Sequence, residues 1–127
     1  MDKVVHFEIP CDDMGKAEKF YQEVFGWQIQ PMPEMRYTII RTVAVDEKHM
    51  PKESGAINGG MDIRDKTTAQ TPVIVIDVAN INDSIKKIVK HGGSLFRMKT
   101  SVGEMGWYAQ VKDNQNNIIG LWETVKE

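Results

Sequence analysis

The residues best able to do chemistry lie in the first predicted strand, Val4–Pro10. His6 and Glu8 are two positions apart, and because successive side chains of a strand point to opposite faces, these two share one face. An imidazole titrates near neutral pH, so His6 could shuttle a proton. Glu8 could act as a general base if apolar surroundings raised its pKa. The alternatives, a hydrogen-bonded pocket residue for His6 and a solvated carboxylate for Glu8, stay open.

Aromatic residues in the second half of the chain could bind a flat ligand. In the predicted strand Ile118–Thr124, Trp122 lies two positions from Gly120, so the two share a face. An indole beside a glycine can form a shelf on which a flat molecule stacks, and the alternative is an indole that merely fills the space. Trp107 and Tyr108 are adjacent in another predicted strand and therefore face opposite sides. The sequence does not say which of these two shares the face of Trp122.

Three further residues are candidates for binding a ligand. Tyr37 and Asn58 lie in predicted strands of the first half, where each could be a polar pocket group or a residue of the core or the surface. Glu104 stands near Gly103 and Gly106, which allow a loop to approach a ligand closely. The alternative for Glu104 is an ordinary exposed turn.

Two stretches of similar pattern must position these residues. The strand Val4–Pro10 is followed by a helix that ends at Gly26, with apolar residues at three- and four-residue spacing. The same pattern of strand, cap, helix and glycine returns in Val73–Gly93, with Gly93 in the place of Gly26. This repetition predicts a duplicated module. The candidate capping residues are Asp12 or Asp13 for the first helix and Asn80 or Asn82 for the second.

Each half continues with strands, so the predicted order is β-α-β-β-β twice, an α+β fold. Residues 62–71 are polar and lack periodicity, which places module one at about residues 1–61 and module two at 72–127, within a single domain of residues 1–127. The predicted strands after the helices are Trp27–Gln30, Met35–Val45, Gly55–Met61, Ser94–Lys99, Gly106–Lys112 and Ile118–Thr124.

Composition excludes several classes of function. The 127 residues are 41% hydrophobic and 27% charged, which is ordinary for a soluble globular domain. A formal charge of −2 offers no basic surface for nucleic acid, and no apolar run approaches the roughly 20 residues of a membrane helix. The first residues do not resemble a signal peptide, and the single cysteine, Cys11, excludes an intrachain disulfide. We therefore expect a cytoplasmic protein.

With both halves in view, the chain resembles the vicinal oxygen chelate superfamily, which includes glyoxalase I, extradiol dioxygenases, fosfomycin-resistance proteins and bleomycin-resistance proteins. The resemblance covers nearly the whole chain and is most specific in DDMGKAEKFYQEVFGW (Asp12–Trp27) and in DNQNNIIGLWE (Asp113–Glu123). It implies paired βαβββ modules that form an open, cup-like, eight-stranded mixed sheet with the helices outside. A ligand or metal would sit on the concave side, which His6 and Glu8 would face.

The resemblance also implies which residues stand where metal-dependent members similar to glyoxalase I carry their ligands, in the first and last strand of each module. His6 stands at the first position, whereas Val73 and Gly120 stand at the two positions of module two and cannot ligate. The closing strand of module one offers only Asn58. A divalent metal needs three or four donors. We therefore expect no metal, with His6 as the only retained ligand position; a divalent metal at a displaced site is the alternative.

Three functions compete on this evidence. The first, which we favour, is a metal-free protein that binds a small molecule in an apolar-aromatic cup. The second is an enzyme, namely a lyase, isomerase or dioxygenase, that uses a shifted metal site or acid–base chemistry from His6 and Glu8. The third is a subunit whose open sheet edges mainly serve association. A homodimer is expected under all three, because the chain is small and has exposed sheet edges.

Overall fold

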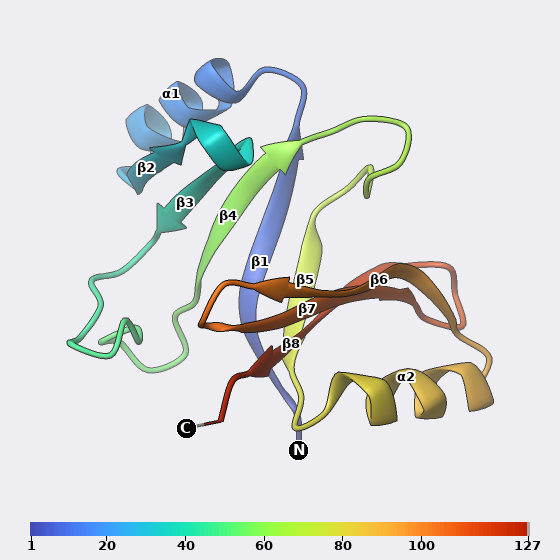
Figure 1. The fold of residues 1–127 in the computed structure, drawn as a ribbon. Helices are drawn as coiled ribbons and strands as arrows, with labels where there is room; N and C mark the ends of the chain where they lie inside the picture. Colours follow the sequence, from blue (N-terminus) through green and yellow to red (C-terminus); the bar gives the residue numbers. More distant parts are fainter. Residues whose placement is uncertain (127) are drawn as a thin grey trace. The chain divides into compact units, whose positions relative to one another are not determined.

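The structure is a computed structural model that describes residues 1–126. Each half of the chain folds as a strand, a helix and three further strands (Figure 1), which confirms the predicted α+β fold. The elements in chain order are β1 (Lys3–Cys11), α1 (Met14–Phe25), β2 (Gln28–Met32), the short 3-10 helix η1 (Pro33–Met35), β3 (Tyr37–Arg41), β4 (Asn58–Ile63), β5 (Val73–Asp77), α2 (Ile81–Lys90), β6 (Ser94–Val102), β7 (Gly106–Lys112) and β8 (Ile118–Thr124).

The strands form one open sheet of eight in the order β2-β3-β4-β1-β5-β8-β7-β6. The pairs β1–β4 and β5–β8 are parallel, whereas β2–β3, β3–β4, β6–β7 and β7–β8 are antiparallel. The predicted eight-stranded mixed sheet is therefore confirmed. In each half the first strand pairs with the last, which is the arrangement expected of a duplicated βαβββ module.

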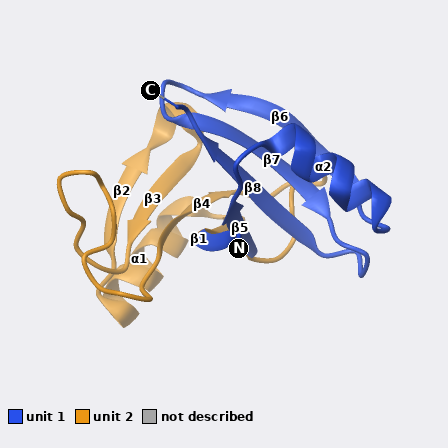
Figure 2. Ribbon diagram, turned by 90° about the horizontal axis from the view of Figure 1, so that it is seen from below, with its two compact units in different colours: residues 1–5, 73–127 blue, residues 6–72 orange. Residues whose placement is uncertain are grey.

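The chain divides into two compact units, which Figure 2 shows in different colours. Unit 2 is the continuous stretch of residues 6–72, and unit 1 combines residues 1–5 with the chain from residue 73 onward. Strand β1 therefore contributes its first residues, Lys3–Val5, to unit 1 and the rest of its length to unit 2. Each unit has its own hydrophobic core.

Both helices begin at residues that the sequence offers as caps. The Asp13 side chain accepts a hydrogen bond from the backbone N–H of Lys16 at 3.0 Å, and the Asn80 side chain accepts one from Asp83 at 2.9 Å. Helix α1 ends at Gly26, which has a left-handed φ of 71° that glycine adopts without strain. With 12 and 10 residues, these helices are too short to cross a membrane, and residues 1–126 contain no other candidate span.

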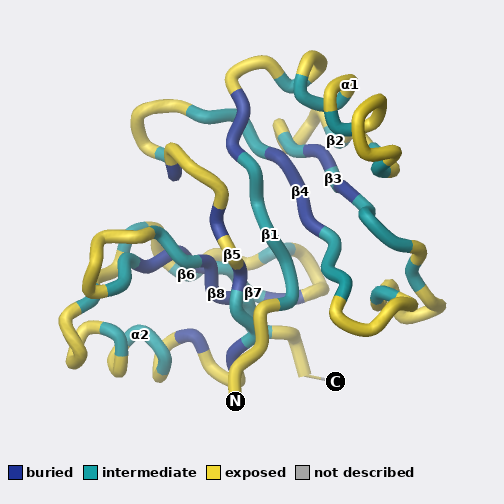
Figure 3. The backbone as a smooth tube through the Cα atoms, turned by 180° about the vertical axis from the view of Figure 1, so that it is seen from behind, coloured by how far each residue is buried: buried dark blue, intermediate teal, exposed yellow. Residues whose placement is uncertain are grey.

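The core of unit 2 lies between α1 and one face of its strands. Cys11, Ile40 and Met61 are buried there. The α1 residues that pack on them lie at helical spacing, since Met14, Ala17 and Tyr21 are three and four positions apart. Most of the remaining α1 surface is exposed, as Figure 3 shows. Helix α1 therefore covers a single face of this part of the sheet.

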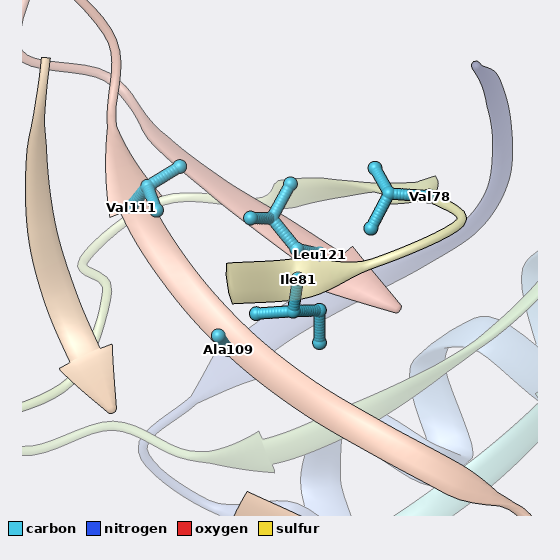
Figure 4. Packing of buried hydrophobic residues seen from close by; sticks show 5 residues of the cluster. All are labelled: Val78, Ile81, Ala109, Val111 and Leu121. Atoms are coloured by element: carbon cyan, nitrogen blue, oxygen red, sulfur yellow. The ribbon is translucent and has the colours of Figure 1, made fainter. Parts of the chain in front are cut away.

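The core of unit 1 lies beneath α2. Figure 4 shows its five buried residues gathered beside β7 and β8: Val78, Ile81, Ala109, Val111 and Leu121. Ile85 and Ile88 of α2 pack against this cluster. Glu123 fixes the start of the helix, because its Oε1 accepts a hydrogen bond from the backbone N–H of Ile81 at 2.7 Å. A carboxylate at a helix N-terminus is favourable, since the free backbone N–H groups and the helix dipole attract negative charge.

The predicted strand Met35–Val45 is too long. Its first residue belongs to η1, Arg36 adopts a left-handed φ of 51°, and β3 ends at Arg41. The side chain of Asn58 explains why β3 ends at Arg41. Its Oδ1 accepts hydrogen bonds from the backbone N–H groups of Thr42 and Val43, at 2.7 and 3.2 Å, in place of a strand partner.

Other strand boundaries also differ from the prediction; the strand predicted at Trp27–Gln30, for example, is β2 at Gln28–Met32. The predicted strand Gly55–Met61 is β4, which begins at Asn58 and continues to Ile63, two residues into the stretch expected to be a linker. The added residues pair with the end of β1. The predicted strand Ser94–Lys99 is β6, which continues to Val102 because its last residues pair with the start of β7.

Candidate functional site

The polar side chains of unit 2 lie on the face of its sheet that α1 does not cover. Phe7 and Ile9 of β1 pack into the core with α1, and because side chains alternate along a strand, His6 and Glu8 point to the other side. The register of β1, β3 and β4 brings further residues to this side. We call it the helix-free face of unit 2. Its residues include His6, Glu8, Tyr37, Asn58, Gly60 and Asp62.

A hydrogen bond between His6 and Tyr37 is the centre of this face. The Nε2 atom of His6 and the hydroxyl oxygen of Tyr37 are 3.0 Å apart. Tyr37 lies on β3 and His6 on β1, with β4 between them in the sheet. The tyrosine ring spans this distance by lying over Gly60, since a Cβ added to Gly60 would overlap the ring and its hydroxyl. The site therefore joins three strands through one tyrosine and one glycine.

Burial sets the protonation state of this pair. It lowers the pKa of His6 from 6.5 to about 4, so the imidazole is neutral at pH 7. Burial, followed by the charges of Glu8 and Asp62, raises the pKa of Tyr37 above its ordinary value, so the phenol keeps its proton. A neutral imidazole has one donor and one acceptor nitrogen, so the hydrogen bond can form in either sense. The pair is thus uncharged at pH 7 and stands close to two carboxyl groups.

Asn58, Asp62 and Glu104 differ in their relation to this pair. Asn58 is the register partner of His6, but its side-chain oxygen is engaged in ending β3. Asp62 lies in the stretch expected to be a linker and was missed from the sequence, although its two-residue spacing from Gly60 would place it on this face. Glu104 is exposed in the turn between β6 and β7, where no strand pairing fixes its side chain.

In unit 1, aromatic rings cover the face of the sheet that α2 does not cover. Tyr108 and Trp122 are direct neighbours across the β7–β8 pair. The Tyr108 ring lies over Gly120, because a Cβ added there would be 2.9 Å from the tyrosine hydroxyl. The Trp122 indole lies over Gly106, where an added Cβ would be 2.6 Å from Cζ2. We call this side the helix-free face of unit 1. Both rings lie flat along the sheet there, each over a glycine.

The structure places Trp107 on the helix side of β7 and Tyr108 on the other side, a choice that the sequence left open. The Trp107 side chain packs against the core cluster with α2, and Nζ of Lys99 lies 4.9 Å from the ring centroid. Trp107 therefore points away from the helix-free face of unit 1, and Tyr108 takes its place. Beside Tyr108, Gln110 is only 4% exposed and donates a hydrogen bond from Nε2 to the tyrosine hydroxyl at 2.9 Å. Sequence reasoning missed Gln110, whose two-residue spacing from Tyr108 was the available signal.

Tyrosine and glycine occupy equivalent positions in the two units. Tyr37 of β3 covers Gly60 of β4, and Tyr108 of β7 covers Gly120 of β8. In both units the tyrosine lies two residues before the register partner of the glycine. The resemblance described above places a metal-ligand position at Gly120. The structure fills this space with a tyrosine ring.

The residues present do not fit the divalent metal that the resemblance implies. A metal ion needs three or four donors from imidazole, carboxylate or thiolate groups. Within residues 1–126, no three or more histidine, cysteine, aspartate or glutamate side chains are grouped so that they could hold an ion. The Nε2 atom of His6 is bonded to Tyr37, and Gly120 offers no donor. The donor set therefore differs from that of a metal centre.

Comparisons with known proteins agree with this fold. Residues 3–42 match the bleomycin resistance protein-like N-terminal family. A glyoxalase/bleomycin resistance protein/dioxygenase superfamily member from Vibrio splendidus 12B01 superposes with a TM-score of 0.64 at 12% identity, covering 97% of this chain and 99% of that chain. Methylmalonyl-CoA epimerase from Mycobacterium tuberculosis superposes with a TM-score of 0.60 at 12% identity, covering 96% and 87%. No curated protein matches the sequence.

The chain therefore has the fold of the glyoxalase/bleomycin resistance protein/dioxygenase group, and the predicted resemblance to the vicinal oxygen chelate superfamily is confirmed. More particularly, its first strand and helix and the strands β2 and β3 fall within the segment that is similar to the N-terminal part of bleomycin resistance-like proteins. At 12% identity the solved structures show the fold and not the activity.

Proposed function

We propose that this protein binds a small molecule on the helix-free face of unit 1 without a metal ion. The observation that carries the proposal is the pair of glycines covered by tyrosines, Gly60 under Tyr37 and Gly120 under Tyr108. In unit 1, the rings of Tyr108 and Trp122 and the amide of Gln110 occupy the surface where the superfamily resemblance would place a metal ligand. Such a surface favours a flat, partly apolar molecule that stacks on the rings and hydrogen-bonds at its edges.

Trp122 is the residue best placed to bind such a molecule. Its indole is held flat by contact with Gly106 and by a hydrogen bond of 3.1 Å from Nε1 to Oγ1 of Thr124. Tyr108 lies directly beside it. A ring that is already fixed loses little conformational entropy when a ligand stacks on it, so these contacts favour binding.

Replacing Trp122 by alanine is expected to weaken ligand binding at least about tenfold, which corresponds to about 1.4 kcal/mol. The ligand would first be found by thermal-shift screening of the wild-type protein, and dissociation constants would then be measured by calorimetry. Trp107→Phe is the matched control, because that tryptophan lies on the helix side of the same strand pair. If Trp122→Ala binds every ligand from the screen as tightly as wild type, the site is wrongly placed.

Protein purified without chelator and without an affinity tag is expected to contain well under one equivalent of transition metal, and dialysis should remove what is present. The reason is the donor set, which offers His6 but no group of three ligating side chains within residues 1–126. Plasma mass spectrometry measures this directly. One equivalent per chain that persists through dialysis would contradict the metal-free proposal, because structural or catalytic sites hold their metal tightly.

An acid–base enzyme is the second candidate function, and the His6–Tyr37 hydrogen bond supports it. Glu8, on the same face of β1, would serve as the base. Solved structures similar to this chain include methylmalonyl-CoA epimerase bound to methylmalonyl-CoA and to 2-nitronate-propionyl-CoA, which makes an acyl-CoA ester the first substrate to test. Deuterium uptake from D2O into methylmalonyl-CoA, measured by mass spectrometry, would favour the enzyme if His6→Gln abolished it without unfolding the protein.

We also propose that the protein is a homodimer of the cytoplasm. The sheet ends in two edge strands, β2 and β6, and free edges favour association. The single cysteine, Cys11, suits a reducing compartment. Light scattering coupled to gel filtration would test the dimer, and a monomer at micromolar concentration would contradict it.

A further inference from the structure

We infer that Gly60 is a positioning residue, because the absence of a side chain at this position is what places the Tyr37 hydroxyl against His6. A side chain at residue 60 and the ring of Tyr37 would occupy the same volume, so the two exclude each other. The contacts behind this inference lie in unit 2, and the inference is independent of the proposed ligand binding.

The path of the Tyr37 side chain depends on residue 60. In register, Tyr37 stands beside Asp62 and not beside Gly60. On the other side of β4, His6 stands beside Asn58. The tyrosine must therefore cross β4 diagonally, between the side chains of Asp62 and Asn58, and the residue between them on this face is Gly60. A Cβ there would overlap Oη, Cζ and Cε1 of the tyrosine.

The backbone conformation does not require glycine at residue 60. Glycine is often needed where φ is positive, but Gly60 is not among the residues with positive φ. Its backbone would accept any residue, so space and not conformation requires glycine. The adjacent Gly59 illustrates the same requirement on the other face, where an added Cβ would overlap the backbone oxygen of Phe7 and lie 2.7 Å from its ring. Two neighbouring glycines thus make room for two different aromatic rings.

The second module repeats the arrangement. A Cβ added to Gly120 would lie 2.9 Å from both the hydroxyl of Tyr108 and Cγ2 of Val75. Real Cβ atoms essentially never approach other atoms more closely than 3.0 Å. A glycine beneath the tyrosine is therefore a property of both closing strands. This recurrence argues against an accidental contact at Gly60.

The decisive experiment replaces Gly60 by alanine and follows the His6 ring protons by NMR during a pH titration. The displaced Tyr37 ring would expose the imidazole to water and to the carboxylates that face it, Glu8 on β1 and Asp62 on β4. We therefore expect the pKa of His6 to rise from about 4 by at least about one unit. Gly120→Ala is the control, since it crowds Tyr108 of unit 1 and should change the pKa of His6 by less than about half a unit.

Thermal unfolding of the double variant gives a second readout. Gly60→Ala alone should lower Tm by roughly 5 °C or more. In a Tyr37→Ala background the same substitution should cost less than about 1 °C, because the ring that it displaces is gone. If the single variant Gly60→Ala fails to fold, the double variant Tyr37→Ala/Gly60→Ala should still fold as well as the single variant Tyr37→Ala. An unchanged His6 titration in Gly60→Ala, or an equal Tm loss in both backgrounds, would overturn the inference.

Discussion

Glutamate in place of Gly120 is expected to lower the free energy of unfolding by about 3 kcal/mol or more. This substitution restores the kind of side chain that the superfamily resemblance places at this position. Gly120 is buried, however, and a Cβ there would press on the Tyr108 hydroxyl and on Val75. The new carboxylate would also enter a space lined by a phenol and an aliphatic side chain. Steric crowding and loss of carboxylate hydration therefore both lower the free energy of unfolding.

Denaturant unfolding of Gly120→Glu against wild type measures this loss. The matched control is Tyr108→Ala combined with Gly120→Glu, in which the removed ring leaves room for the carboxylate. The loss of unfolding free energy in this double variant should be smaller than the sum of the losses in the two single variants. A Gly120→Glu protein as stable as wild type would contradict the tight packing of Tyr108 on Gly120.

Lowering the pH from 7.5 to 4.5 is expected to cost the wild-type protein about 2–3 kcal/mol of stability through His6 alone. Burial holds the pKa of folded His6 near 4, whereas the value in the unfolded chain is 6.5. Between these values the unfolded chain binds a proton that the folded protein does not bind. The free energy of unfolding is therefore unaffected by the titration of His6 above pH 6.5, and it decreases as the pH falls from 6.5 towards 4.

The pH effect is measured by urea unfolding at several pH values in wild type and in His6→Gln, which cannot titrate. The variant should lack most of the decline between pH 6.5 and 4.5. His49→Asn is the control, because His49 is exposed and its left-handed φ of 63° suits asparagine. This control should keep the wild-type pH dependence. Four carboxyl groups have pKa values lowered by hydrogen bonds, so they add losses of stability mainly at still lower pH. They belong to Asp12, Asp46, Asp65 and Asp113. An identical decline in wild type and His6→Gln would show that the imidazole is not buried.

The fold could be predicted because its signals are local. Alternating apolar residues mark the first strand of each module, and helical spacing followed by Gly26 or Gly93 marks each helix. The order of elements then follows from the duplication. Strand ends were predicted less well, because they depend on distant groups. Asn58, for example, ends β3 through the backbone of Thr42 and Val43.

The arrangement of the candidate site required information that the sequence does not contain. His6 and Glu8 could be placed on one face by alternation within a single strand. The contact of Tyr37 with His6 depends on the register of three strands, one of which follows a long loop after β3. A shift of one residue reverses the face of every side chain in a strand. For this reason the sequence could not choose between Trp107 and Tyr108, although it showed that the two must point apart.

The division of β1 between the units has a consequence for how the protein is made. Residues 1–5 are synthesised before residues 6–72, yet they belong with the chain from residue 73 onward. Unit 2 is continuous and can fold while synthesis proceeds. Unit 1 must wait until its second segment exists, and closing the intervening stretch costs chain entropy. Deletion of residues 1–5 would therefore act on the unit that is otherwise built from residue 73 onward.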